Sequence, residues 1–112
     1  MIEKDEISPY KALDFIRDNA EAYASAKANV VYMTEYRKTI KALLMNESIA
    51  KTESAKESYA YAHENYIQHL KALAQAVEKA EQLRWLMIGA QAKIEVWRSL
   101  ESSARAEGKA TQ

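Results

Sequence analysis

The chain has 112 residues, a length typical of one domain, and its 16 acidic and 16 basic residues give a formal net charge of zero. This balance argues against binding of nucleic acid or of an anionic membrane by bulk charge. The sequence has no cysteine, which excludes disulfides, a thiolate nucleophile and a cysteine zinc site. No apolar run approaches the roughly 18 residues that span a bilayer, and MIEKDEIS is unlike a secretory signal. We therefore expect a cytoplasmic protein.

Two glycines and one proline leave few places for turns, so the elements should be few and long. Ser8 predicts an N-cap, and Pro9 fits the first helical position. Apolar residues then recur every three or four positions, which is the period of a helix packed along one face. This first stripe, interrupted at Arg37, comprises Leu13, Ile16, Ala20, Tyr23, Ala26, Val30, Met33, Ile40 and Leu44. The pattern predicts a helix over residues 9–45.

The segment NESIAKTES, residues 46–54, predicts a turn over about 46–53. Asn46 can end a helix in the left-handed conformation. Ser54 and Glu57 have the spacing of a capping box, with Thr52 as a rival N-cap. A second helix is expected over about 54–107, ending near Gly108. Its stripe is Tyr59, Ala62, Tyr66, Leu70, Leu73, Val77, Ala80, Leu83, Met87, Ala90, Ile94, Trp97, Leu100 and Ala104.

Two helices joined by a short link should pack antiparallel, so the predicted fold is a single all-α domain, a long coiled-coil-like hairpin. Both stripes contain two successive steps of three residues, 20 to 23 to 26 and 77 to 80 to 83. In a hairpin centred near residue 50, these irregularities lie at the same height. They indicate two helices shaped against each other, with coincidence in an alanine-rich sequence as the alternative.

The second predicted helix is longer than the first, about 80 Å against about 55 Å at about 1.5 Å per residue. Pro9 then lies opposite residues 91–94, and an apolar patch projects beyond the first helix. This patch comprises Ile94, Trp97, Leu100 and Ala104. We expect a second copy of the chain to cover it in a dimer or larger bundle. Alternatively, residues 1–8, with Met1, Ile2 and Ile7, fold over it, or the helix bends at Gly89 and its last third folds back.

Catalytic and metal motifs are not found. His63 and Glu64 begin HENYI, which fails the H-E-x-x-H pattern because residue 67 is Ile. His63 and His69 are six residues apart, on different sides of a helix, so they cannot share one metal ion. No Glu-x-x-His pair, phosphate-binding G-x-x-x-x-G-K motif or nucleophile elbow occurs. We expect a protein that is not an enzyme and that holds no metal and no cofactor.

Charge is spread unevenly, with a net of −2 over residues 1–8 and +2 over residues 84–112. The two segments can pair when the hairpin closes. The basic segment interleaves Arg and Lys with Trp97 and Trp85, a combination suited to single-stranded nucleic acid. The same residue types are enriched at hot spots of protein interfaces. The candidate contacts to nucleic acid or to a protein partner are Arg84, Trp85, Lys93, Arg98 and Arg105.

LRW at 83–85, Ala90, IEVWRSL at 94–100 and Arg105 follow Tyr66 and leucines at 70 and 73. This pattern resembles a group of small helical proteins of tailed bacteriophages, described as coil-containing proteins. Some of these are encoded near genes for recombination and single-strand annealing. The resemblance implies a phage or prophage origin, the host bacterial cytoplasm, and a role in DNA metabolism or host takeover. It supplies no catalytic residues.

Three functions follow from these observations. The leading hypothesis is a non-enzymatic accessory protein of phage recombination that acts through a protein partner. The second is a small phage inhibitor of a host defence or nucleic-acid enzyme. The third is direct binding of single-stranded nucleic acid through the basic aromatic C-terminal segment.

Overall fold

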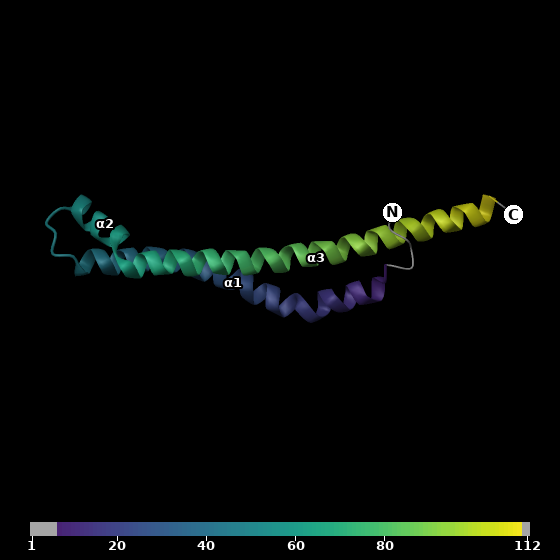
Figure 1. The fold of residues 1–112 in the computed structure, drawn as a ribbon, viewed down its shortest axis with the longest axis horizontal. Coiled ribbons are helices and arrows are strands. Elements are labelled where there is room, and N and C mark those ends of the chain that lie inside the picture. Colours follow the sequence, from purple (N-terminus) through teal and green to yellow (C-terminus); the bar gives the residue numbers. More distant parts are fainter. Residues whose placement is uncertain (1–6, 111–112) are drawn as a thin grey trace. The chain divides into compact units, whose positions relative to one another are not determined.

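The computed structural model describes residues 7–110, and that range is 92% helical, with three helices and no strand (Figure 1). The helices are α1 (Pro9–Glu47), α2 (Glu53–Ala62) and α3 (Glu64–Ala110). The all-α helical hairpin predicted from the sequence is therefore confirmed. No helix within residues 7–110 contains an apolar stretch long enough to cross a membrane.

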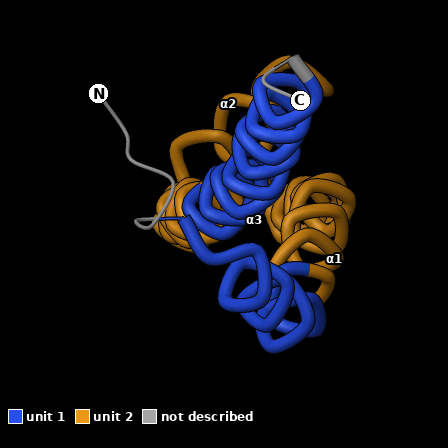
Figure 2. Tube along the Cα trace, turned by 90° about the vertical axis from the view of Figure 1, so that its right-hand side faces the viewer, with its two compact units in different colours: residues 1–23, 82–112 blue, residues 24–81 orange. Residues whose placement is uncertain are grey.

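The chain divides into two compact units, which Figure 2 shows in different colours. Unit 1 comprises residues 1–23 and 82–112, and unit 2 comprises residues 24–81. Each unit contains part of α1 and part of α3, and α2 belongs to unit 2. The organisation of the whole chain as one domain stays a prediction.

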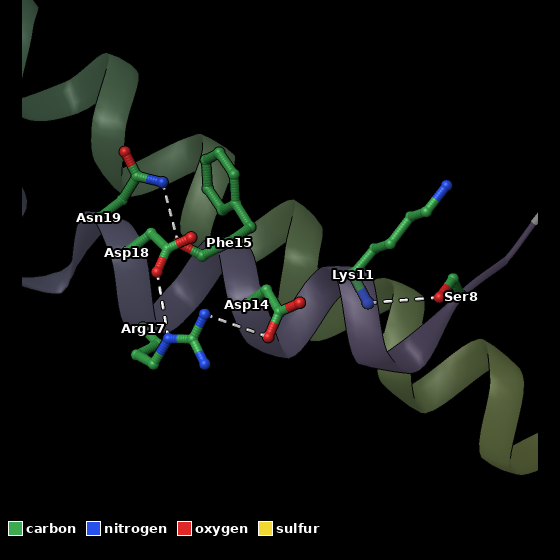
Figure 3. A network of polar contacts seen from close by, with 7 residues as sticks. All are labelled: Ser8, Lys11, Asp14, Phe15, Arg17, Asp18 and Asn19. Carbon is green, nitrogen blue, oxygen red and sulfur yellow. Dashed lines mark hydrogen bonds and ion pairs between the residues drawn. The ribbon is translucent and has the colours of Figure 1, made fainter.

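The start of α1 is fixed by its capping residue. The Lys11 backbone N–H donates to the Ser8 hydroxyl oxygen at 3.2 Å (Figure 3). The Ala12 N–H donates to the Ser8 carbonyl at 3.1 Å. Pro9 occupies the first helical position, where its missing N–H has no helical acceptor to lose. The helix thus begins at the predicted residue.

The end of α1 and the start of α2 differ from the prediction. Asn46 lies inside α1, and no residue between 7 and 110 has a positive φ, so the predicted left-handed cap at Asn46 is wrong. The Ser48 backbone N–H makes the last helical hydrogen bond of α1, donating to the Leu44 carbonyl at 3.1 Å. Thr52, not Ser54, is the N-cap of α2, and its hydroxyl accepts the Ala55 N–H at 3.1 Å. The non-helical segment is residues 48–52.

The predicted second helix is not continuous, because it breaks at His63. This residue is extended, with φ −70° and ψ 141°, and it separates α2 from α3. Its Nδ1 atom accepts the Asn65 N–H at 3.0 Å, and its carbonyl accepts the Ile67 N–H at 3.1 Å. His63 therefore acts as the N-cap of α3, a role that usually falls to Ser, Thr, Asp or Asn.

Helix α3 runs through Gly89 and Gly108 without interruption, and neither glycine has a positive φ. The alternative in which the segment after Gly89 folds back as a separate helix is therefore wrong. The helix ends at Ala110, two residues beyond Gly108.

The inward faces of α1 and α3 follow a regular heptad, with steps that alternate between three and four residues. Buried or half-buried positions in α1 include Ala12, Ile16, Asn19, Tyr23, Ala26, Val30, Met33, Arg37, Ile40 and Leu44. Those in α3 include Tyr66, His69, Leu73, Ala76, Ala80, Leu83, Met87, Ala90, Ile94 and Trp97. Asn19 and Ala76 are thus more enclosed than the predicted members Ala20 and Val77. This pattern contains no two successive steps of three residues. The matching irregularities in the two apolar stripes were therefore a coincidence.

The core is thin, because two helices cannot enclose a large side chain completely. No large side chain among residues 7–110 is fully buried. The main cluster lies in unit 2, where Leu44, Ala60 and Tyr66 pack with Ile40 and Met45. Helix α2 supplies Ala60, which is the most buried residue, so the break at His63 folds α2 over this cluster (Figure 1).

Candidate functional site

An apolar groove of about 520 Å³ lies in unit 1, between the start of α1 and the middle of α3. We call it the unit 1 groove. One wall consists of Ser8, Lys11, Ala12 and Phe15, and the other of Trp85, Leu86, Gly89, Ala90 and Lys93. The predicted register placed Pro9 opposite residues 91–94, and the same two segments meet at this groove.

The groove combines buried small residues with exposed large ones. Ala12 and Ala90 are buried, so the two helices approach closely at these positions. Trp85 and Leu86, in contrast, are 60% and 55% exposed. At Gly89 an added Cβ would meet no atom within 4 Å, so this glycine leaves the groove open along α3. Within the described residues, unit 1 therefore has large apolar side chains exposed beside the groove.

The groove is basic at its edges. Lys11 on α1 and Lys93 on α3 contribute one ammonium group from each wall, and no carboxylate of residues 7–110 lines the groove. The Arg84 guanidinium lies over the Trp85 ring, 5.1 Å from its centroid. This cation–π contact favours the observed orientation of the indole. The electrostatics favour a ligand that is apolar along its centre and acidic at its flanks.

Charged side chains occupy the solvent-exposed face of α1, whereas Phe15 lines the groove. Arg17 contacts Asp18 at 3.1 Å and Asp14 at 3.4 Å, and Figure 3 shows the Phe15 ring leaving α1 in a different direction. The hydrogen bond to Asp18 and the attraction of Asp14 raise the pKa of the Arg17 guanidinium above its usual value. The Asn19 side-chain amide donates to the Phe15 carbonyl at 2.9 Å.

The structure separates the sequence-predicted contact residues into two places. Trp85 and Lys93 line the unit 1 groove, with Arg84 stacked on Trp85. Arg98 and Arg105 lie further along α3. They line a second hollow of about 450 Å³, formed by Glu95, Trp97, Arg98, Ser99, Glu101, Ser102 and Arg105. Arg98 contacts Glu95 at 3.0 Å, so the second hollow contains carboxylates as well as basic groups.

The predicted self-association patch is only partly exposed. Ile94, Trp97 and Leu100 are half-buried, and Ala104 is exposed. Ile7, one member of the segment expected to fold over this patch, is buried. Met1, Ile2 and the acidic residues at positions 3, 5 and 6 lie outside the described residues.

Four groove residues were missed by the sequence reasoning, namely Lys11, Ala12, Phe15 and Leu86. None belongs to an apolar stripe of the expected spacing. Leu86 directly follows Trp85, and neither residue belongs to the second apolar stripe. Two adjacent large apolar residues outside the stripe were the sequence feature that could have indicated this wall of the groove. Pairing with α1 then turns the two residues into one wall of a groove.

Within residues 7–110, no group of three or more histidine and acidic side chains could hold a metal ion. Comparisons of the chain with protein-family models, with curated proteins and with solved structures found no match.

Proposed function

We propose that this protein acts without catalysis, by binding a protein partner whose amphipathic helix lies in the unit 1 groove. The observation that carries this proposal is the pair of exposed side chains, Trp85 and Leu86, on the wall of an open apolar groove. A large exposed apolar patch with a polar rim usually marks an interaction site. Burial of both side chains by a partner could stabilise the complex by about 1.5–3 kcal/mol each.

The shape and the charge of the groove define the partner segment. Two helices form its walls, so a third helix can pack along it with apolar residues at three- and four-residue spacing. Lys11 and Lys93 stand on opposite walls and favour Glu or Asp on both flanks of that helix. Trp85, whose orientation is favoured by the contact with Arg84, is the expected hot spot, because a side chain ordered in advance loses little entropy on binding.

The groove lining supports a binding role over catalysis. Among the described residues, its lining has two lysines and one serine as polar groups, and it has no histidine, aspartate or glutamate that could exchange protons with a substrate. Proton transfer would therefore depend on a lysine or on the substrate. Nothing in the groove activates Ser8, whose hydroxyl oxygen accepts the helix-capping hydrogen bond.

For the setting, we propose phage DNA metabolism, with a phage recombinase or nuclease as the partner. This setting rests on the sequence resemblance described above. The alternative partner is a host defence or nucleic-acid enzyme, which the protein would inhibit. Capture from phage-infected and from uninfected lysates, followed by mass spectrometry, separates the two settings.

The decisive test compares two leucine variants of equal exposure. Leu86→Glu places a carboxylate in the groove, whereas Leu43→Glu makes the same change in unit 2, where Leu43 is 58% exposed. We expect Leu86→Glu to lose the captured partner and Leu43→Glu to retain it. Equal capture by both variants would overturn the assignment of the groove.

We also propose that copies of this chain associate through Ile94, Trp97, Leu100 and Ala104. Light scattering over a range of concentrations gives the molar mass, and Trp97→Ala should lower it if this patch forms the seam. A monomeric wild type at every concentration would remove self-association from the proposal.

A second candidate function is binding of single-stranded nucleic acid at the second hollow. The observation in its favour is that Trp97, Arg98 and Arg105 line one surface together. Affinity for an oligonucleotide should then fall steeply with salt and should drop on substitution of Trp97 or Arg98 by Ala. No binding at low salt would remove this candidate.

A further inference from the structure

A further hollow, in unit 2, brings basic and aromatic side chains together. Three cationic residues of α1, namely Arg37, Lys38 and Lys41, line one hollow of about 250 Å³. Tyr61 of α2 and Tyr66 of α3 complete its wall. We call it the basic tyrosine pocket. All three helices of the described chain contribute to it, so the fold and not one helix surface creates it.

The tyrosines are fixed by their surroundings. The Tyr61 and Tyr66 rings meet edge to face, with centroids 5.2 Å apart and an interplanar angle of 77°. The Lys41 ammonium lies 4.9 Å from the centre of the Tyr61 ring. Tyr66 is buried, whereas Tyr61 is 47% exposed. The pocket thus has an ordered aromatic wall that solvent molecules can reach.

The balance of charge leaves one cation without a counter-ion. Lys38 contacts Glu35 at 3.1 Å, and Lys41 contacts Glu57 at 3.0 Å. Arg37 makes no ion pair with any residue in the described range. It also occupies a half-buried heptad position, where an apolar residue is expected. A half-buried guanidinium one turn from another cation is unfavourable unless an anion neutralises it.

We propose that the basic tyrosine pocket binds a phosphate group. The Arg37 guanidinium can pair with two phosphate oxygens at once, and the Lys38 ammonium can supply a further charge-assisted hydrogen bond. The Tyr61 hydroxyl can donate to a third oxygen. The Lys38–Glu35 pair does not prevent this, because an exposed ion pair is weak and exchanges readily with another anion.

The size of the pocket limits the ligand. A volume of about 250 Å³ lies below the roughly 300–1,000 Å³ of sites for whole cofactors or drug-sized molecules. The pocket therefore accommodates a phosphate group, either free or as the monoester end of a larger molecule that extends into solvent. The exposed edge of Tyr61 is the side on which the remainder of such an ester would lie.

The test uses inorganic phosphate and phosphoserine as probes, with the full chain. Thermal unfolding and the NMR signal of the Arg37 side-chain N–H are followed as each probe is added at constant ionic strength. We expect a saturable shift of both readouts with phosphate. A tighter response to phosphoserine would identify a monoester as the preferred source, and an equal response would identify free phosphate.

Matched variants separate this pocket from general charge effects. Arg37→Gln should weaken phosphate binding by about tenfold or more, because a charge-assisted bidentate contact is lost. Arg17→Gln makes the same change on an exposed face in unit 1 and should leave the binding unchanged. Tyr61→Phe keeps the ring and removes the hydroxyl, so it should weaken binding less. An Arg37→Gln protein that is folded by circular dichroism and binds phosphate as the wild type does would overturn the proposal, as would no saturable shift.

Discussion

The Nε2 atom of His69 on α3 lies 2.7 Å from the carbonyl oxygen of Met33 on α1. Both residues belong to unit 2 and are 36 positions apart in the sequence. The contact requires a proton on Nε2, which donates to a carbonyl that already belongs to a helix. The His69 ring also lies against Tyr36, with centroids 6.0 Å apart. This side-chain contact therefore fixes the height of α3 against α1 in unit 2.

The cross-helix hydrogen bond gives the first prediction. His69→Leu keeps an apolar contact but loses the donor, so unit 2 should be destabilised by about 1 kcal/mol. Urea unfolding measures this loss. His69→Gln retains an N–H donor at a similar reach and should recover part of the stability. Equal stability of the wild type and the Leu variant would show that the hydrogen bond contributes nothing.

The break at His63 gives a second prediction. His63→Ala removes the acceptor for the Asn65 N–H and should cost about 1 kcal/mol, as is typical of a lost N-cap. His63→Asp supplies an oxygen acceptor and should retain most of the stability. Hydrogen exchange at the Asn65 amide reports the cap directly, and it should speed up only in the Ala variant. Faster exchange in both variants would assign the effect to ring contacts with Tyr59, which lies 5.5 Å away between centroids.

Gly89 gives a third prediction, because it lies in the interior of α3 with open space around it. Gly89→Ala should stabilise the protein by about 0.5–1 kcal/mol, since Ala loses less backbone entropy on forming a helix. Gly108→Ala, close to the end of α3, should have a smaller effect because helix ends fray. Urea unfolding of the two variants makes the comparison. A destabilised Gly89→Ala protein would mean that the groove closes on this position.

The fourth prediction is that the folded protein loses stability at alkaline pH, because of Lys41 and Tyr59 in unit 2. Hydrogen bonds to Tyr61 and Glu57 raise the pKa of the Lys41 ammonium above its usual value of 10.5. Partial burial and a hydrogen bond to Glu47 raise the pKa of the Tyr59 hydroxyl above 10.0. Both groups hold their protons more tightly when folded. Their contribution to stability is therefore complete below about pH 10 and is lost as the pH rises through the folded pKa values.

The alkaline loss can be traced to Lys41 by comparing two lysine variants. Lys41→Met should make the urea midpoint fall less steeply between about pH 10 and pH 12 than it does in the wild type. The exposed Lys71→Met, also in unit 2, should keep the wild-type slope. Identical slopes for all three proteins would show that the contacts of Lys41 with Tyr61 and Glu57 do not contribute to the alkaline loss of stability.

The sequence by itself determined the helical class and the pairing of the long helices. Three features of the sequence predict this arrangement. They are the scarcity of Gly and Pro, the cap at Ser8, and apolar residues at three- and four-residue spacing. These features are local in the sequence or strictly periodic along it. They can therefore be recognised without knowing which residues lie close together in the folded protein. The same periodicity located most of the inward face, from Ile16 to Leu44 in α1.

Tertiary structure decided where the periodicity is broken. Residues 53–62 and those after 63 are all compatible with one helix, and no Gly or Pro marks a boundary between them. The break occurs because it allows α2 to fold back and bury Ala60 against Leu44 and Tyr66, and a histidine serves as the cap. Burial against residues distant in the sequence outweighs a few weak local preferences.

Both candidate sites also depend on tertiary structure. Trp85 could be singled out from the sequence as an aromatic residue in a basic segment, but Leu86 and Lys11 become groove residues only when α1 and α3 pair in unit 1. Likewise, Arg37 was visible as a gap in an apolar stripe. Its neighbours Tyr61 and Tyr66 reach it only because the chain turns at His63. Periodicity identifies which face of a helix is buried, whereas a site requires side chains from several helices to converge in space.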